Sequence, residues 1–262
     1  MRRVVSVFLP RWPTDRLRRK DHAAPPRDKP LVLAAIEGQR RVLASVDEAA
    51  SALGLTRGMT VTHAQSLVPG LTVLDATPDA DTDDLERLGH WCTKYSPLVT
   101  PNPPDGIFID IAGSAHLFQG EAALIEDLLR RLRKSEISAK AAIADTPGCA
   151  WAVARYGDTP IVSPGRASEA IASLPIAALR LADSVIASLH EVGIERVAHL
   201  ASKPRSSLHL RFGADVLLRF DQALGSVTEA LTSLVPSEVP QCELKFAEPL
   251  GDPEDLKRVI SK

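Results

Sequence analysis

The sequence has few cysteines, no paired histidines and no long apolar run. Its three cysteines, Cys92, Cys149 and Cys242, are far apart and odd in number, which argues against a disulfide framework and a CxxC zinc site. The seven histidines form no HxxxH pair and none has a cysteine at ligand spacing, so we expect neither a metal site nor a cofactor. No run approaches the roughly 20 apolar residues that cross a bilayer, and residues 1–20 lack the apolar core of a secretory signal. These absences predict a soluble cytoplasmic protein with no membrane partner.

What is present is the composition of an ordinary globular protein. The 262 residues are 45% hydrophobic and 24% charged, and this length predicts two or three small domains. The net charge of −2 hides a division, because residues 1–74 carry 12 Lys/Arg against 6 Asp/Glu and residues 75–165 carry 8 against 14. The basic N-terminal block fits a phosphate-facing surface and an ordinary solvated surface equally well.

Strand and helix patterns alternate through the first 165 residues. Apolar runs and period-two alternation predict strands at 4–8, 31–35, 41–46, 106–112 and 138–144, and helical spacing or propensity predicts helices at 15–20, 47–53, 62–67, 83–95, 121–134 and 148–156. Thr14 is predicted to cap the first of these helices. The alternation predicts an α+β fold in which residues 1–10 and 74–165 form one layer and residues 11–73 form an inserted subdomain.

From residue 168 onward the strand signals disappear and short helices replace them. Predicted helices at 183–191 and 194–202 flank Val192, Gly193 and Ile194, which is the outline of a helix-hairpin-helix. Such a turn brings its backbone close to a DNA phosphate, and the N–H groups that open the second helix can bind the anion without sequence preference. Lys203 and Arg205 are the candidate side-chain contacts to DNA. A plain αα-hairpin with Gly193 as a helix cap fits the same pattern.

Two acidic features have a structural and a functional interpretation. We interpret Asp110 as a structural aspartate that binds a loop, the alternative being a residual ion site shared with Asp105. We interpret the acidic residues at 79, 81, 83, 84 and 86 as a solvated helix start that favours the helix dipole, the alternative being a contact for a basic partner.

Several segments resemble, in the right order, motifs of the Y-family of translesion DNA polymerases. Residues 54–59 (GLTRGM), followed by Ala64, resemble the fingers motif of that family. Residues 94–99 (KYSPLV) and 108–113 (FIDIAG) resemble its palm stretch, and the helix-hairpin-helix lies where the family has its thumb.

The resemblance implies a polymerase core built from three subdomains. These are an α/β palm (1–10 and 74–165), small fingers (11–73) and an all-α helix-hairpin-helix thumb (166–235). Residues 236–262 would form a linker and the start of the little-finger domain, which is absent or truncated here.

The metal-binding motifs of the family are degenerate in this sequence. The first-strand motif V-D-x-D aligns with residues 7–10, so that Phe8 and Pro10 stand where the aspartates belong. The turn S-I-D-E aligns with residues 103–106, which keeps one carboxylate, Asp105, and replaces the glutamate by Gly106. A single carboxylate is a poor ligand set for magnesium.

The triphosphate-binding positions are replaced as well. Glu48 and Ser51 align with the tyrosine and arginine that hold the triphosphate in active members, and Pro147 aligns with a lysine of a later palm motif. Glu48 would repel phosphate, and Ser51 lacks the guanidinium fork. The resemblance therefore implies no polymerisation and no nucleotide binding below millimolar concentration.

Such losses are typical of the ImuB-like group of bacterial mutagenesis proteins, which residues 8–13 (FLPRWP) also resemble. This resemblance implies a non-catalytic adaptor in SOS-induced mutagenic translesion synthesis and repair, located at the nucleoid. Its implied partners are DNA, bound weakly and without sequence preference, and the sliding clamp, a RecA-like companion and an error-prone replicative-type polymerase, bound through regions beyond residue 262. Two alternatives stay open: a manganese-dependent nucleotidyltransferase that uses Asp105 and Asp110, and a sequence-independent helix-hairpin-helix DNA-binding protein.

Overall fold

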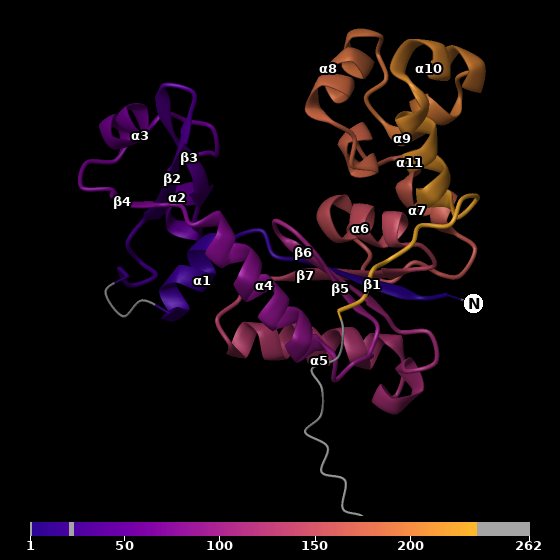
Figure 1. Ribbon diagram of the computed structural model, residues 1–262, viewed down its shortest axis with the longest axis horizontal. Helices are drawn as coiled ribbons and strands as arrows, with labels where there is room; N and C mark the ends of the chain where they lie inside the picture. The colour runs from indigo at the N-terminus through magenta and orange to yellow at the C-terminus, as the bar shows by residue number, and fades with distance from the viewer. Residues whose placement is uncertain (1, 21–23, 235–262) are drawn as a thin grey trace, which may run out of the picture.

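The computed structural model (Figure 1) describes residues 2–20 and 24–234. Its strands are β1 (Val4–Phe8), β2 (Leu31–Glu37), β3 (Arg40–Val46), β4 (Thr72–Asp75), β5 (Val99–Asn102), β6 (Gly106–Asp110) and β7 (Lys140–Ala144). Its α-helices are α1 (Trp12–Lys20), α2 (Glu48–Ala52), α3 (Val61–Leu67), α4 (Pro78–Cys92), α5 (Glu121–Lys134), α6 (Pro147–Tyr156), α7 (Ala167–Ala172), α8 (Asp183–Glu191), α9 (Val197–Ala201), α10 (Arg205–Phe212) and α11 (Ala214–Leu224). Over this described part of the chain, none of the helices has the length and apolar character that crossing a bilayer demands.

A four-stranded antiparallel sheet with the order β5-β6-β1-β7 forms the centre of the molecule. Side chains of a strand alternate between the two faces of a sheet. Val5 and Val7 therefore join the core beneath α4 and α5, whereas Phe8 packs against the core beneath α6. Figure 1 shows the sheet between these two helical layers. We call the face covered by α6 the front face, and the face covered by α4 and α5 the back face.

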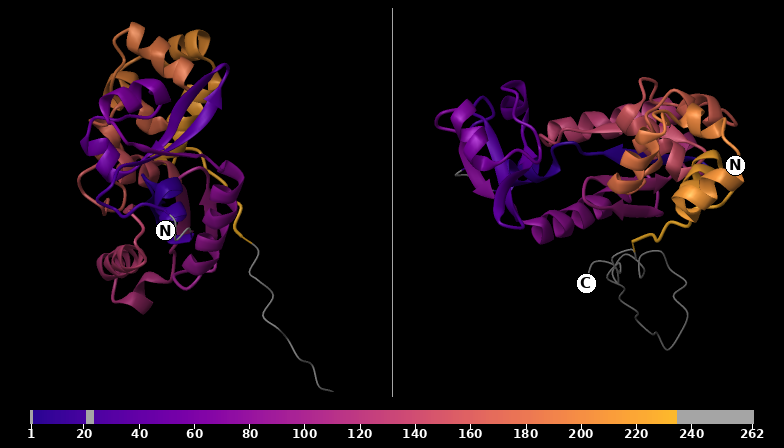
Figure 2. Two further views of the ribbon diagram at one scale, coloured as in Figure 1. Left: turned by 90° about the vertical axis from the view of Figure 1, so that its left-hand side faces the viewer. Right: turned by 90° about the horizontal axis from the view of Figure 1, so that it is seen from above.

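A smaller sheet with the order β3-β2-β4 has its own core, which includes Leu43, Leu55 and Ala64. The glycine motif at 54–59 closes this core because Gly58 donates its N–H to the carbonyl of Leu43 at 2.9 Å, with a φ of +81° that side-chain-bearing residues rarely adopt. Figures 1 and 2 show this sheet at one end of the molecule and helices α8–α11 at the other.

Residues 167–224 form short helices joined by turns, as predicted, and their core is continuous with that of α6. The second helix of the hairpin begins at Val197 and not at Ile194, which corrects its predicted start. Ile194 belongs to the turn, where its N–H donates to the carbonyl of Leu189 at 3.0 Å. The exact boundaries of palm, fingers and thumb stay a prediction, and residues 236–262 lie outside the described residues.

Two further expectations were wrong, one about the start of α1 and one about the solvation of α4. Helix α1 begins at Trp12, because a proline in the first turn lacks only an N–H that would be unpaired anyway. Thr14 therefore lies inside the helix, where its hydroxyl donates to the carbonyl of Arg11. Asp81 and Asp84 of α4 are buried against α1 and are not solvated, because they share a helix face with the core residue Leu85.

Candidate functional site

The structure brings together three of the four degenerate metal-site positions. Phe8 and Gly106 are paired across β1 and β6, and the N–H of Leu9 donates to the carbonyl of Asp105 at 2.8 Å. Antiparallel pairing of β1 with β6 therefore places residues about 100 positions apart at one end of the sheet. Pro10 follows directly and is exposed.

A buried arginine that the sequence analysis did not single out completes this site. Arg155 of α6 is 6% exposed, and its Nη2 lies 2.5 Å from Oδ1 of Asp105. Its Cζ lies 4.3 Å from the ring centroid of Phe8 and 4.0 Å from that of Trp151, within the range of cation–π attraction. Burial lowers the pKa of Arg155, an effect that the Asp105 carboxylate only partly offsets. Among the described residues, its Nη1 has no hydrogen-bond partner.

These residues do not fit a site for two divalent metal ions. Such a site needs several carboxylate oxygens, whereas the single carboxylate at this end of the sheet already binds a guanidinium. Position 106 is also crowded, because a Cβ placed on Gly106 would lie 3.2 Å from Nη2 of Arg155. Within the described ranges, no cluster of three or more His, Cys, Asp or Glu side chains could hold a metal. The guanidinium of Arg155 therefore neutralises the Asp105 carboxylate.

Asp110 is separated from this site, which argues against the Asp105–Asp110 ion site. It lies at the other end of β6, four residues from Gly106, or about 13 Å at the rise of a β-strand. Its carboxylate accepts hydrogen bonds from Nε of Arg2 at 3.0 Å and from the N–H of Ala112 at 3.1 Å. The interpretation as a structural aspartate that holds a loop is confirmed.

The degenerate triphosphate-binding positions face different surroundings. Glu48, on α2, binds Nη1 of Arg11 at 3.0 Å and lines a hollow of about 280 Å³. Arg11 also lines a neighbouring hollow of about 630 Å³ beside Phe8. Ser51 is exposed. Pro147 is buried in the first turn of α6 and lines neither hollow.

In the helix-hairpin-helix, the backbone donors are already used within the turn. The N–H groups of Val192 and Ile194 donate to the carbonyl of Leu189, and that of Gly193 donates to His190. A phosphate at this turn would therefore have to accept hydrogen bonds from donors other than these three predicted N–H groups.

Side chains around the turn offer other donors. Lys203 lines a hollow of about 200 Å³ together with Val192 and Ile194. The guanidinium of Arg205 instead donates to both carboxylate oxygens of Asp221, at 3.0 and 2.5 Å. Within the described residues, Lys203 has no such carboxylate partner, which leaves it the better placed cation.

Comparison with solved structures shows the fold. The chain resembles DinB from Sulfolobus solfataricus with a TM-score of 0.68 and 18% identity, covering 89% of this chain and 70% of that one. It resembles Dbh DNA polymerase in an insertion ternary complex with a TM-score of 0.73 and 18% identity, covering 87% and 69%. The predicted α+β fold of a Y-family polymerase core is confirmed.

Comparison with protein sequences shows the family. Protein ImuB of Caulobacter vibrioides (strain NA1000 / CB15N) is 47% identical over 210 residues, which are 80% of this chain and 46% of that protein. DNA polymerase IV of Pseudomonas syringae pv. syringae (strain B728a) is 27% identical over 71% of this chain and 54% of that enzyme. The chain thus spans about half the length of the curated relatives it matches. Residues 17–155 match the family model described as "IMS: impB/mucB/samB family". The chain therefore belongs to the impB/mucB/samB family, with Protein ImuB among its relatives.

Proposed function

We propose that this chain is a non-catalytic, polymerase-like module that acts on DNA in mutagenic translesion synthesis and repair. The single observation that carries this proposal is the contact of 2.5 Å between Arg155 and Asp105 at the joined ends of β1 and β6. The similarity to a protein named ImuB and to enzymes named DNA polymerase IV supports the link to DNA synthesis.

The physical argument concerns what a guanidinium can and cannot replace. Two divalent ions would activate the primer hydroxyl and hold the triphosphate in line for attack. The Arg155 guanidinium supplies positive charge beside Asp105, but it has no exchangeable coordination positions for a hydroxyl or a phosphate. Glu48 adds a negative charge at a position aligned with a phosphate-binding tyrosine. The charge of Asp105 is thus balanced by Arg155, but metal-dependent nucleotidyl transfer is lost.

The retained function would be to hold DNA and to connect partners. DNA binding should be weak and independent of sequence, with Lys203 as the main thumb contact and no more than a few phosphates neutralised. The affinity would then fall gently with salt, by about 0.9 logarithmic units per phosphate for each tenfold rise in salt. We further propose a role in the SOS response as an adaptor for the sliding clamp, a RecA-like companion and an error-prone polymerase, through regions beyond residue 262.

Primer extension tests the inactive site. Purified chain, labelled primer–template DNA and all four deoxynucleotides are incubated with magnesium or with manganese. We expect no incorporation above the no-protein control, because Phe8 and Gly106 provide no metal ligands. A bacterial DNA polymerase IV, assayed in parallel, verifies the substrate.

The same assay identifies the alternative. Incorporation by the chain that requires manganese and disappears in Asp105→Ala would sink the proposal and favour a nucleotidyltransferase. Incorporation that survives Asp105→Ala would point to a contaminating polymerase, and the preparation would be repurified and assayed again.

A further inference from the structure

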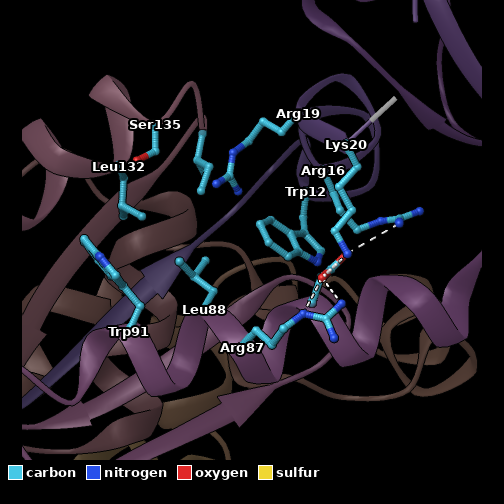
Figure 3. A pocket seen from close by; sticks show the side chains of 11 residues that line it. Trp12, Arg16, Arg19, Lys20, Arg87, Leu88, Trp91, Leu132 and Ser135 are labelled. Carbon is cyan, nitrogen blue, oxygen red and sulfur yellow. Dashed lines mark hydrogen bonds and ion pairs between the residues drawn. The ribbon is translucent and has the colours of Figure 1, made fainter. Parts of the chain in front are cut away.

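The back face of the sheet carries a hollow of about 300 Å³ between α1, α4 and α5, which we call the back hollow. Its floor is apolar and is formed by Trp12, Leu88, Trp91, Leu132 and Ile137. Trp12 is 1% exposed, and its Nε1 donates to the carbonyl of Asp81 at 2.8 Å, which fixes the indole ring. Trp91 is 36% exposed, so apolar surface remains open to a ligand. Figure 3 shows Trp12, Leu88, Trp91 and Leu132 around the hollow.

The rim of the back hollow is positively charged. Arg16, Arg19, Lys20 and Arg87 line it together with Asp84, and a second carboxylate, Asp81, lies 2.5 Å from Nε of Arg16. The ammonium of Lys20 lies 2.6 Å from Asp84, and Arg16 and Arg87 also approach that carboxylate (Figure 3). Arg19 is exposed and points away from this cluster in Figure 3; no described carboxylate pairs with it. The rim therefore has an excess of cations over an apolar floor.

This combination favours a peptide over a nucleic acid. The ammonium of Lys94 lies 3.3 Å from the centroid of the Trp91 ring and covers one of its two faces, which leaves a single face for a ligand. The remaining floor contains the aliphatic Leu88 and Leu132, which suit an apolar side chain. The hollow also lies on the opposite face of the sheet from Phe8 and Arg155. Its volume is at the lower end of ligand sites, about 300 Å³, which suits an anchor of one or two side chains.

We propose that the back hollow docks an acidic segment of a partner protein, with one or two large apolar side chains on the floor and flanking carboxylates on the rim. Burial of the apolar side chains supplies the attraction, and the carboxylates select the partner. Arg19 is the principal selector, because it does not have to leave an existing ion pair among the described residues. This docking does not depend on whether the front face is catalytic.

Fluorine NMR can observe the hollow directly, because the chain has three tryptophans. The full chain is labelled with 5-fluorotryptophan, and the signals are assigned with Trp91→Phe and Trp151→Phe. Trp151 contacts Arg155 on the front face and is an internal control. The probe is the blocked peptide Glu-Glu-Leu-Phe-Glu-Glu. We expect the Trp91 and Trp12 signals to shift on titration while the Trp151 signal stays in place.

Two comparison peptides separate the two parts of the proposal. The peptide with glutamine in place of each glutamate, and the peptide with glycine in place of Leu-Phe, should each bind at least tenfold more weakly. Arg19→Glu should weaken the parent peptide at least tenfold. Arg57→Glu makes the same charge change at an exposed position on the small subdomain and should leave its affinity unchanged.

Several outcomes would overturn docking of an acidic segment. These are the absence of a selective Trp91 shift, equal binding by Arg19→Glu and Arg57→Glu, and equal binding of the three peptides. A larger Trp91 shift with a short oligothymidine would assign the hollow to nucleic acid. A Trp91 signal that changes with protein concentration in the absence of peptide would assign it to a second copy of the chain.

Discussion

The two faces of the four-stranded sheet each carry an arginine bound to an aspartate, but the two pairs have different surroundings. On the front face, Arg155 lies between two aromatic rings and binds one carboxylate that is 25% exposed. On the back face, Arg16 lies between Asp81 and Asp84, whose side chains are 11% and 7% exposed. The front pair fills its site, whereas the back pair forms the wall of an open hollow.

The difference shows how the same ion pair can close one site and build another. The Arg155 guanidinium packed on aromatic rings occupies the position beside Asp105, whose carboxylate can still be reached by water. A guanidinium held between buried carboxylates becomes part of the helix interface, and the exposed Arg19 beside it has no ion pair to leave among the described residues. The removal of each arginine should therefore have a different consequence.

The largest expected effect is on stability. Arg16→Met leaves the buried Asp81 without its cation, whereas Asp84 keeps Lys20 and Arg87, and the loss at Asp81 should lower the free energy of unfolding by about 3–5 kcal/mol. Arg155→Met leaves Asp105 hydrated and keeps apolar packing against Phe8, so the loss should be about 1 kcal/mol or less. Urea unfolding of both variants at neutral pH measures the two values. Equal losses would mean that the two pairs are equivalent and that the comparison fails.

A second, smaller effect tests the closure of the front face. In a chain with Phe8→Asp and Gly106→Glu, the new glutamate lies next to Arg155 and should pair with it, because Cβ at position 106 is 3.2 Å from Nη2. Addition of Arg155→Met to this chain should strengthen manganese binding at least tenfold, because a like charge is removed. Electron paramagnetic resonance of free manganese measures the binding. Equal affinity with and without Arg155 would show that the guanidinium does not block the site.

Elements with strong local patterns could be predicted from the sequence. Helix α5 and strand β1 have the predicted bounds, because α5 repeats its apolar residues at the helical period and β1 is a short β-branched apolar run that prolines follow. The start of α1 could not be predicted, because Pro13 fits both a turn and a first helical turn. The turn at Ile194 was mistaken for helix, because an apolar residue after glycine has no local signal for its backbone conformation.

The candidate site could be predicted only in part. Motif alignment identified Phe8, Asp105 and Gly106 as degenerate positions, and pairing of β1 with β6 brings them together. Arg155 could not be assigned to them, because its contact with Asp105 spans 50 residues of sequence and depends on how α6 packs on the sheet. The available signal was a lone arginine four residues after Trp151 in an otherwise uncharged helix.

The acidic run of α4 shows a second limit. Its spacing does not reveal which carboxylates face α1, and the cations that bind them come from a helix more than 60 residues earlier. The acidic run alone therefore predicted a solvated helix start, whereas Asp81 and Asp84 lie in a buried interface.

The smallest expected effect concerns acid and separates the two carboxylates of the back pair. Burial raises the pKa of Asp84, but hydrogen bonds from Lys20 and Arg87 lower it more, so it lies below its ordinary value. Burial raises the pKa of Asp81 more than Arg16 lowers it, so it lies above. The stabilisation from Asp84 is thus present above the ordinary value, about 4, and is lost as the pH falls through its lowered pKa. Asp81 has the opposite effect on stability: its pKa is higher in the folded chain than in the unfolded chain, so its protonation favours folding as the pH falls.

Asparagine substitutions should therefore change the acid sensitivity in opposite directions. Between pH 5 and pH 3, the melting temperature of Asp84→Asn should fall less than that of the unmodified chain, because the variant lacks the carboxylate whose protonation destabilises the fold. The melting temperature of Asp81→Asn should fall more over the same pH range, because the variant lacks a carboxylate whose protonation favours the folded state. Differential scanning calorimetry at the two pH values, with Asp110→Asn on the front face as control, measures the differences. Parallel changes in both back-face variants would mean that Asp81 and Asp84 titrate as one unit and that Arg16 does not distinguish them.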